Sequence, residues 1–267
     1  RVEMRMAAEA AGLASRSYGT VTSGLPADRA RLRNQGALLK EVRELLTLSR
    51  GYGMESVRQR AMSTAETVSA SLSEVVDDSA LELVVDLRLA FGRLLAALGA
   101  NERAEKEHLD TAELSLSQGW TETACAALAL ASHAAQARGD RASSGRAWRQ
   151  CRETMESWPM NRPGERCGIL VDAVGDPLVA VQVLSALAEV LVDGVEEDHS
   201  RAPIIREIIS RASEQASRCV NPPQGAVESL ARVEERIAPY GRGRGGRRRP
   251  GSSTTIRTDG RAASEGE

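Results

Sequence analysis

Aromatic residues and lysine are both scarce in this sequence. Of its 267 residues, only 3% are Phe, Trp or Tyr. A core with so few rings must be built from Leu, Val, Ile and Ala, which favours close-packed helices over a β-sandwich or β-barrel, because aromatic and β-branched residues dominate strands. Only Lys40 and Lys106 are lysines among 35 basic residues, a bias that we interpret as the codon usage of a GC-rich genome.

No apolar run is long enough for a membrane span. The longest, from residue 178 to 192, is interrupted by Gln182, Ser185 and Glu189, and it falls short of the roughly 20 residues that a bilayer requires. We therefore expect no membrane partner. The chain begins with Arg1 and not with Met, so we expect that an N-terminal segment has been removed or that the chain is a fragment.

Metal and disulfide patterns are also missing. The four cysteines, Cys125, Cys151, Cys167 and Cys219, are widely spaced without a CxxC pair, and the three histidines are scattered along the chain. This spacing argues against a metal site. Since no signal peptide precedes them, the cysteines are expected to be reduced and buried, and the protein to be cytoplasmic.

Motifs of catalysis are absent in the same way. The sequence has no GxSxG, SxxK, HExxH or GxxxxGK[ST] segment. Its carboxylates alternate with arginines, as at Glu102-Arg103, which is typical of a solvated helix face. We therefore expect a protein that is not an enzyme and that needs no cofactor.

What the sequence does contain is helical periodicity, most clearly from Trp120 to Trp158. Two helices are predicted there, the first opened by Thr121 as cap and ended by Gly139, the second capped by Asp140. Small residues recur at three- and four-residue steps on the first helix, and larger ones on the second. The inward positions are predicted to be Ala124, Leu128, Ala131 and Ala135, then Ser144, Ala147, Trp148, Cys151 and Met155.

Similar patterns predict helices along most of the chain and suggest four segments. We expect an N-terminal helix and loop at 1–26, a helical-repeat region at 27–158, further hairpins at 159–240 and a disordered tail at 241–267. Whether residues 160–176 separate two domains is left open. The expected inward positions of the outer helices include Ala61, Ala65 and Val68, Phe91 and Leu95, His108, Ala112 and Leu116, Leu184 and Leu191, Ile205 and Ile208, and Val227, Leu230, Val233 and Ile237.

Two hairpin turns, at Gly99 and Gly139, lie 40 residues apart, and the residues around them resemble tetratricopeptide repeats. In that family, small residues and one aromatic interlock two antiparallel helices at fixed offsets from the turn. The positions that match are Phe91, Gly92, Leu95, Gly99 and Ala104 in one repeat, and Leu128, Ser132, Ala135, Gly139, Ser144, Trp148 and Cys151 in the next. The resemblance covers about residues 80–160; its spacing exceeds the family's 34, and His108 and Thr111 depart from its pattern.

This resemblance implies an all-α fold of stacked antiparallel hairpins, a tetratricopeptide-like α-solenoid, and a function in protein–protein interaction. The first helices of the hairpins would line a groove for a protein or peptide partner. The groove residues would then be Asp86, Arg88, Thr123 and His133. Such arrays often form the sensor or scaffold part of bacterial regulators that carry a DNA- or nucleotide-binding domain.

The alternative is association with nucleic acid. Five arginines, Arg242, Arg244, Arg247, Arg248 and Arg249, open a tail too poor in apolar residues to fold, and they could contact phosphates. A weaker pattern at 7–21 resembles a helix-turn-helix, which would place residues 15–17 in a DNA groove. Removing residues 241–267 is expected to separate the two readings.

Overall fold

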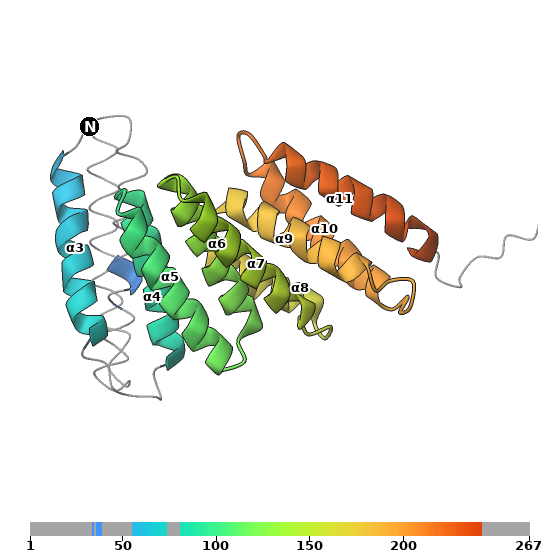
Figure 1. Cartoon of the computed structure of the whole chain (residues 1–267), viewed down its shortest axis with the longest axis horizontal. Coiled ribbons are helices and arrows are strands. Elements are labelled where there is room, and N and C mark those ends of the chain that lie inside the picture. The colour runs from blue at the N-terminus through green and yellow to red at the C-terminus, as the bar shows by residue number, and fades with distance from the viewer. Residues whose placement is uncertain (1–33, 35, 39–54, 74–80, 242–267) are drawn as a thin grey trace, which may run out of the picture.

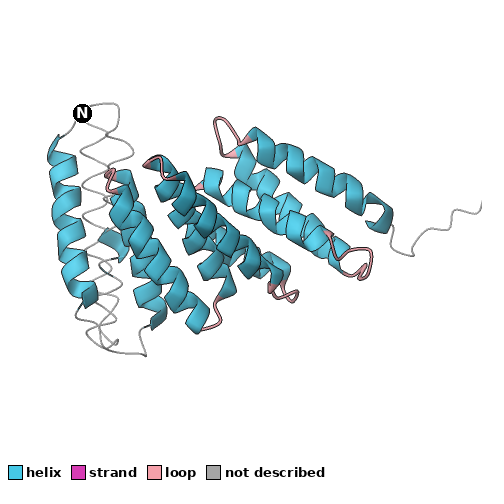
Figure 2. Ribbon diagram, in the orientation of Figure 1, coloured by secondary structure: helices cyan, strands magenta, loops and turns pink. Residues whose placement is uncertain are grey.

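The structure is a computed structural model that describes residues 34, 36–38, 55–73 and 81–241. Within these residues all regular structure is helical, which confirms the all-α class (Figure 2). Residues 34 and 36–38, at the start of the predicted helical-repeat region, are helical. The predicted N-terminal helix and loop at 1–26, parts of the helical-repeat region and the tail from 242 lie outside the described residues.

The helices are of similar length. Those of the first part are α3 (Glu55–Ser73), α4 (Leu81–Ala97), α5 (Asn101–Ser117), α6 (Thr121–Ala137) and α7 (Arg141–Glu156). Those of the second part are α8 (Pro163–Val174), α9 (Pro177–Val192), α10 (Arg201–Ser217) and α11 (Gln224–Ile237), followed by the 3-10 turn η2 (Ala238–Gly241).

The helices follow one another across an elongated molecule, from α3 at one side to α11 at the other (Figure 1). From α4 to α7 each packs against the next in the chain, and helices two apart also pack, α6 and α10 against α8, and α7 and α11 against α9. From α6 onward, the even-numbered helices thus pack side by side in one layer and the odd-numbered helices from α7 to α11 in another. This arrangement is compatible with a repeat-like helical fold.

Three turns in the first half share one backbone motif. Gly99, Gly119 and Gly139 have φ angles of 82°, 73° and 84°, a left-handed conformation that glycine adopts without steric cost. The residue after each glycine donates its N–H to the carbonyl five residues earlier, with N···O distances of 2.9–3.0 Å. This is the Schellman helix end, and it confirms the predicted ends at Gly99 and Gly139.

Aspartate caps begin two of the helices, as predicted. The side chain of Asp140 accepts a hydrogen bond from the N–H of Ser143 at 2.9 Å, and Asp176 accepts one from Leu178 at 2.9 Å, ahead of Pro177. The predicted cap at Thr121 is wrong, because Thr121 is the first residue of α6 and its N-cap is Trp120, without a side-chain hydrogen bond. A residue inside the helix cannot serve as its own cap.

Helix α6 is the centre of the fold. Every residue from Ala124 to Ser132 is buried, because α4, α5, α7, α8 and α9 all pack around it. Its small side chains allow the neighbouring backbones to approach on all sides. The buried positions predicted for this helix and for α7 are confirmed, except that Ser144 and Trp148 are only half-buried.

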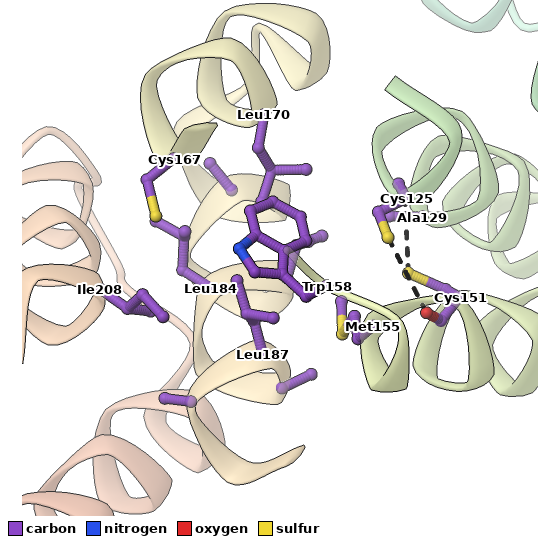
Figure 3. Close-up of a cluster of buried hydrophobic side chains, with 14 of the residues drawn as sticks. Cys125, Ala129, Cys151, Met155, Trp158, Cys167, Leu170, Leu184, Leu187 and Ile208 are labelled. Carbon is purple, nitrogen blue, oxygen red and sulfur yellow. Dashed lines mark hydrogen bonds between the residues drawn. The ribbon is translucent and has the colours of Figure 1, made fainter. Parts of the chain in front are cut away.

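The main core continues from α6 into the second half of the chain. Figure 3 shows the ring of Trp158 between α8 and α9, with Leu170, Leu184 and Leu187 around it and Met155 beside it. One contiguous cluster of buried side chains extends from Val85 to Ile237. A second cluster joins α3, α4 and α5 and includes the predicted Ala61, Ala65 and Val68. The domain division at 158/159 stays a prediction.

Two predicted core positions are wrong. Leu116 and Val227 are each 40% exposed. Leu116 lies in the last turn of α5, and Val227 lies in the first turn of α11. At both places the period of the helix continues, but no neighbouring helix extends far enough to cover the side chain, and periodicity alone cannot reveal that.

His108 is buried against a glycine of the preceding helix. Its ring on α5 is 1% exposed, and a Cβ at Gly92 of α4 would lie 2.4 Å from Cε1 of the ring. Gly92 is therefore the residue that lets the histidine enter the interface. Burial, together with the nearby charge of Arg93, lowers the pKa of His108 from 6.5 to about 3.

Candidate functional site

One hollow is a groove of about 780 Å³ bounded by α6, α7, α9 and α11. Helix α9 packs against both α7 and α11, so α7 and α11 form the sides and α9, with the C-terminal half of α6, forms the base. We call this hollow the α7–α11 groove. Its volume lies in the range of ligand-binding sites.

Small side chains form the base of the groove and polar ones its sides and rim. The buried lining residues are Ala129, Ser132, Ser185, Ala186 and Ser229. The half-buried ones are Ser144, Trp148, Arg152, Gln182, Glu189 and Ala226, and the exposed ones are His133, Gln136, Gly139, Arg141, Gly145 and Gly225.

Serine hydroxyls hold the helices around the groove together. Ser132 Oγ donates to the carbonyl of Ser144 at 3.0 Å and joins α6 to α7. Ser185 Oγ donates to the carbonyl of Ala226 at 3.1 Å and joins α9 to α11. Because the side chains are small and these bonds fix the backbones, the hollow is part of the packed structure and need not form when a ligand arrives.

Glu189 links three helices at one end of the groove. Its carboxylate accepts hydrogen bonds from Arg152 of α7, at 2.9 Å, and from Ser229 of α11. Burial would raise the pKa of Glu189, but these two hydrogen bonds outweigh that effect and the pKa is lowered. Glu189 is the only carboxylate among the lining residues, and it is already paired.

Several rim groups are free. Within the described part of the chain, the side chains of His133, Gln136, Arg141 and Gln182 have no hydrogen bond or ion pair. The lining contains two arginines, Arg141 and Arg152, and one carboxylate, Glu189, so it carries one net positive charge. The groove thus offers donors, an unpaired guanidinium and the half-buried ring of Trp148 to a molecule inside it.

Gly145 leaves an open space in the side formed by α7. It lies inside a helix, where glycine is less stable than alanine by roughly 1 kcal/mol. A Cβ built on Gly145 would have no atom within 4 Å, so packing does not require a glycine. Trp148 follows one turn later on the same face and lines the same groove.

A second, smaller hollow of about 360 Å³ lies between α3, α4 and α5. It is lined by Phe91, Leu95 and charged side chains, among them Arg88, which forms an ion pair with Glu107 at 3.1 Å. Burial is the main reason why the pKa of Glu107 is raised. Because this hollow has less than half the volume of the α7–α11 groove, it is the weaker candidate.

The four residues predicted to line a groove are not brought together. His133 lines the α7–α11 groove, Arg88 lines the smaller hollow, and Asp86 and Thr123 line neither. Asp86 is exposed on α4 and Thr123 is half-buried on α6. The larger groove is also bounded mainly by second helices of the hairpins, in contrast to the expectation that first helices would line it.

The arginines proposed for nucleic acid, Arg242, Arg244, Arg247, Arg248 and Arg249, and the helix-turn-helix pattern lie outside the described residues. Among the residues described, no three His, Cys, Asp or Glu side chains gather as metal ligands. No described helix combines the length and the apolar composition of a membrane span.

All four cysteines are free thiols, and three are buried. Cys151 Sγ donates to the carbonyl of Cys125 at 3.4 Å across the α6–α7 interface (Figure 3). The hydrogen bond with Cys151 and burial raise the pKa of the Cys125 thiol, and burial raises that of Cys167 to about 12. Both stay protonated at neutral pH, which makes them poor nucleophiles.

Sequence reasoning missed most of the groove, including Arg141, Gly145, Gln182 and Ser229. One signal was present in the sequence: Gly145 lies inside the predicted helix that follows Asp140 and not at its end, so the glycine does not serve as a helix stop. Comparisons with protein-family models, with curated proteins and with solved structures give no match for this chain.

Proposed function

We propose that this protein is a non-enzymatic interaction module that binds a protein or peptide partner in the α7–α11 groove. The observation that carries the proposal is a preformed hollow of about 780 Å³. Its base is lined by small side chains and held by hydrogen bonds between helices, while several polar side chains on its rim have no partner. Unpaired donors around a shaped hollow are what a peptide backbone and its side chains require for specific binding.

Such binding would suit the sensor or scaffold part of a regulator, the role that the likeness to tetratricopeptide repeats implies. Partner binding at the groove would contact four helices, α6, α7, α9 and α11, and so would couple both halves of the array. A change in partner concentration could then be transmitted to a domain joined to the chain.

Site-specific photo-crosslinking in the source cell tests the proposal. Gln136 on the groove rim is replaced by p-benzoylphenylalanine, and the matched control places the same side chain at Gln118, the C-cap of α5. We expect a discrete adduct from position 136 and none from position 118. In a second version the 136 probe is combined with Gly145→Leu, which projects an apolar side chain into the groove and should abolish the adduct.

An adduct that forms equally at both positions, or that persists with Gly145→Leu, would show that the groove is not the binding surface. Mass spectrometry of the adduct identifies the partner. Circular dichroism of each variant verifies that the helical fold is retained.

A further inference from the structure

We infer that the α7–α11 groove takes a peptide segment with an acidic side chain two residues from an apolar one. The acid pairs with Arg141, and the apolar side chain packs against Trp148 in the space left at Gly145. This inference rests on the proposed function and specifies the partner's chemistry.

Charge supports the acidic side chain. Arg141 is exposed on the rim and has no carboxylate partner in the described part of the chain, and the only lining carboxylate, Glu189, is already bonded to Arg152 and Ser229. A basic ligand would therefore meet an unpaired guanidinium, whereas an acidic one would satisfy it.

Shape supports the apolar side chain. Gly145 has open space where its Cβ would lie, and the half-buried Trp148, three residues later on α7, lines the same groove. A half-buried tryptophan in a hollow is the kind of residue that contributes most to peptide affinity, because it offers a large rigid surface.

The spacing follows from helix geometry. Arg141, Gly145 and Trp148 lie at i, i+4 and i+7 on one face of α7, so Arg141 and Gly145 are about 6 Å apart along the axis. Alternate side chains of an extended peptide are roughly 6.6 Å apart and point to the same side. An acid and an apolar residue at positions i and i+2 therefore match the two positions.

A polyanion fits this surface less well than a peptide. Nucleic acid binds through a series of cations spaced along its phosphates, but the groove has a single unpaired arginine, and the carboxylate of Glu189 also lines it. We therefore favour a peptide as the ligand of the groove, and the test below includes an oligonucleotide that would reveal nucleic-acid binding.

The test is a selection from a displayed library of random 12-residue peptides with capped ends, using the full-length chain as bait. Selected peptides are then titrated by fluorescence anisotropy. The variants are Arg141→Glu, Gly145→Leu and the matched control Arg149→Glu, which reverses an exposed arginine of α7 outside the groove. All variants keep the Arg-rich tail, so any attraction of acidic peptides to the tail is common to them.

We expect peptides with Asp or Glu two residues from Leu, Met, Phe or Trp. Arg141→Glu should weaken the binding of the selected peptides about tenfold. A selection against this variant should yield peptides with Lys or Arg in place of the acidic residue. Gly145→Leu should abolish binding, and Arg149→Glu should leave it unchanged. Gly145→Ser, which fills less of the space, is expected to weaken binding only partly and serves if the leucine variant does not fold.

Three results would overturn the inference. Peptides that lose binding to Gly145→Leu but show no acidic preference would refute it and leave the proposed function intact. Peptides that bind Gly145→Leu as well as wild type would refute both. Displacement of a selected peptide by a 12-nucleotide oligothymidylate from wild type, but not from Arg141→Glu, would assign the groove to nucleic acid.

Discussion

His108 is a histidine that the fold keeps neutral. Its pKa of about 3 lies below the 6.5 of an exposed histidine, so between these values the unfolded chain binds a proton that the folded chain does not. The stabilising contribution is complete above pH 6.5 and is lost as the pH falls towards 3. We expect the free energy of unfolding to drop by up to about 1.4 kcal/mol per pH unit in this window.

Urea denaturation at pH 7.5 and pH 5 measures this effect. Carboxylates with a raised pKa, such as Glu107, have the opposite effect, because they stabilise the folded state as the pH falls. The informative quantity is therefore the difference in pH dependence between wild type and His108→Leu. The exposed His133→Leu is the control and should retain the wild-type pH dependence. An equal pH dependence in wild type and His108→Leu would contradict the assignment.

Two glycines inside helices should respond oppositely to the same substitution. Gly92→Ala places a methyl group 2.4 Å from the His108 ring and is expected to lower the free energy of unfolding by roughly 1–3 kcal/mol. Gly145→Ala meets no atom within 4 Å and should raise it by about 0.5–1 kcal/mol through helix propensity. Thermal and urea unfolding of both variants provide the measurement.

A double variant identifies the cause. If the methyl group acts through the histidine ring, Gly92→Ala combined with His108→Ala should lose less stability than the two single changes together. Strict additivity would mean that the strain at Gly92 has another source.

At the scale of the helices, α8 is attached to its neighbours at both ends. Near its start Arg166 forms an ion pair with Glu122 of α6, whose side chain is 8% exposed. At its end Arg93 of α4 donates to the carbonyl of Ala173 at 2.7 Å. The short helix thus joins the second half of the array to the first through polar contacts as well as through its apolar face.

Loss of the first attachment should be costly. Arg166→Met leaves the buried carboxylate of Glu122 without its cation, and we expect a loss of roughly 2–3 kcal/mol in the free energy of unfolding. Adding Glu122→Leu should recover part of this loss. Arg162→Met, which removes an exposed ion pair with Glu165, should change stability by less than about 0.5 kcal/mol.

Hydrogen exchange of α8 amides reports the same change locally. Faster exchange in Arg166→Met but not in Arg162→Met is expected. Equal exchange in the two variants would mean that the ion pair between Arg166 and Glu122 does not hold α8 in place.

The helices were predictable because their ends are encoded locally. Gly139 and Asp140 end and begin helices through their own backbone and side-chain atoms, so the sequence reveals them without knowledge of the fold. Leu116 was not predictable, because its exposure depends on whether a neighbour reaches it. The groove was not predictable for the same reason: Arg141 and Gln182 face one hollow only because α7 and α9 pack as they do.

For the whole molecule, the tail and the folded body should differ in what they bind. If the nucleic-acid alternative holds, the full chain should bind nucleic acid with strong salt dependence through Arg242, Arg244 and Arg247–249, whereas residues 1–240 should not. Filter binding of duplex DNA at two salt concentrations measures this. Retention of DNA by residues 1–240 would place the nucleic-acid contact elsewhere.

The three equivalent turns have a consequence for how such a chain can grow. Gly99, Gly119 and Gly139 recur every 20 residues, and each reverses the direction of the chain. Duplication of a single 20-residue unit would make all later helices run the opposite way and would separate α7 from its partners in the groove. Duplication of 40 residues restores the direction, so this architecture can lengthen only by whole hairpins.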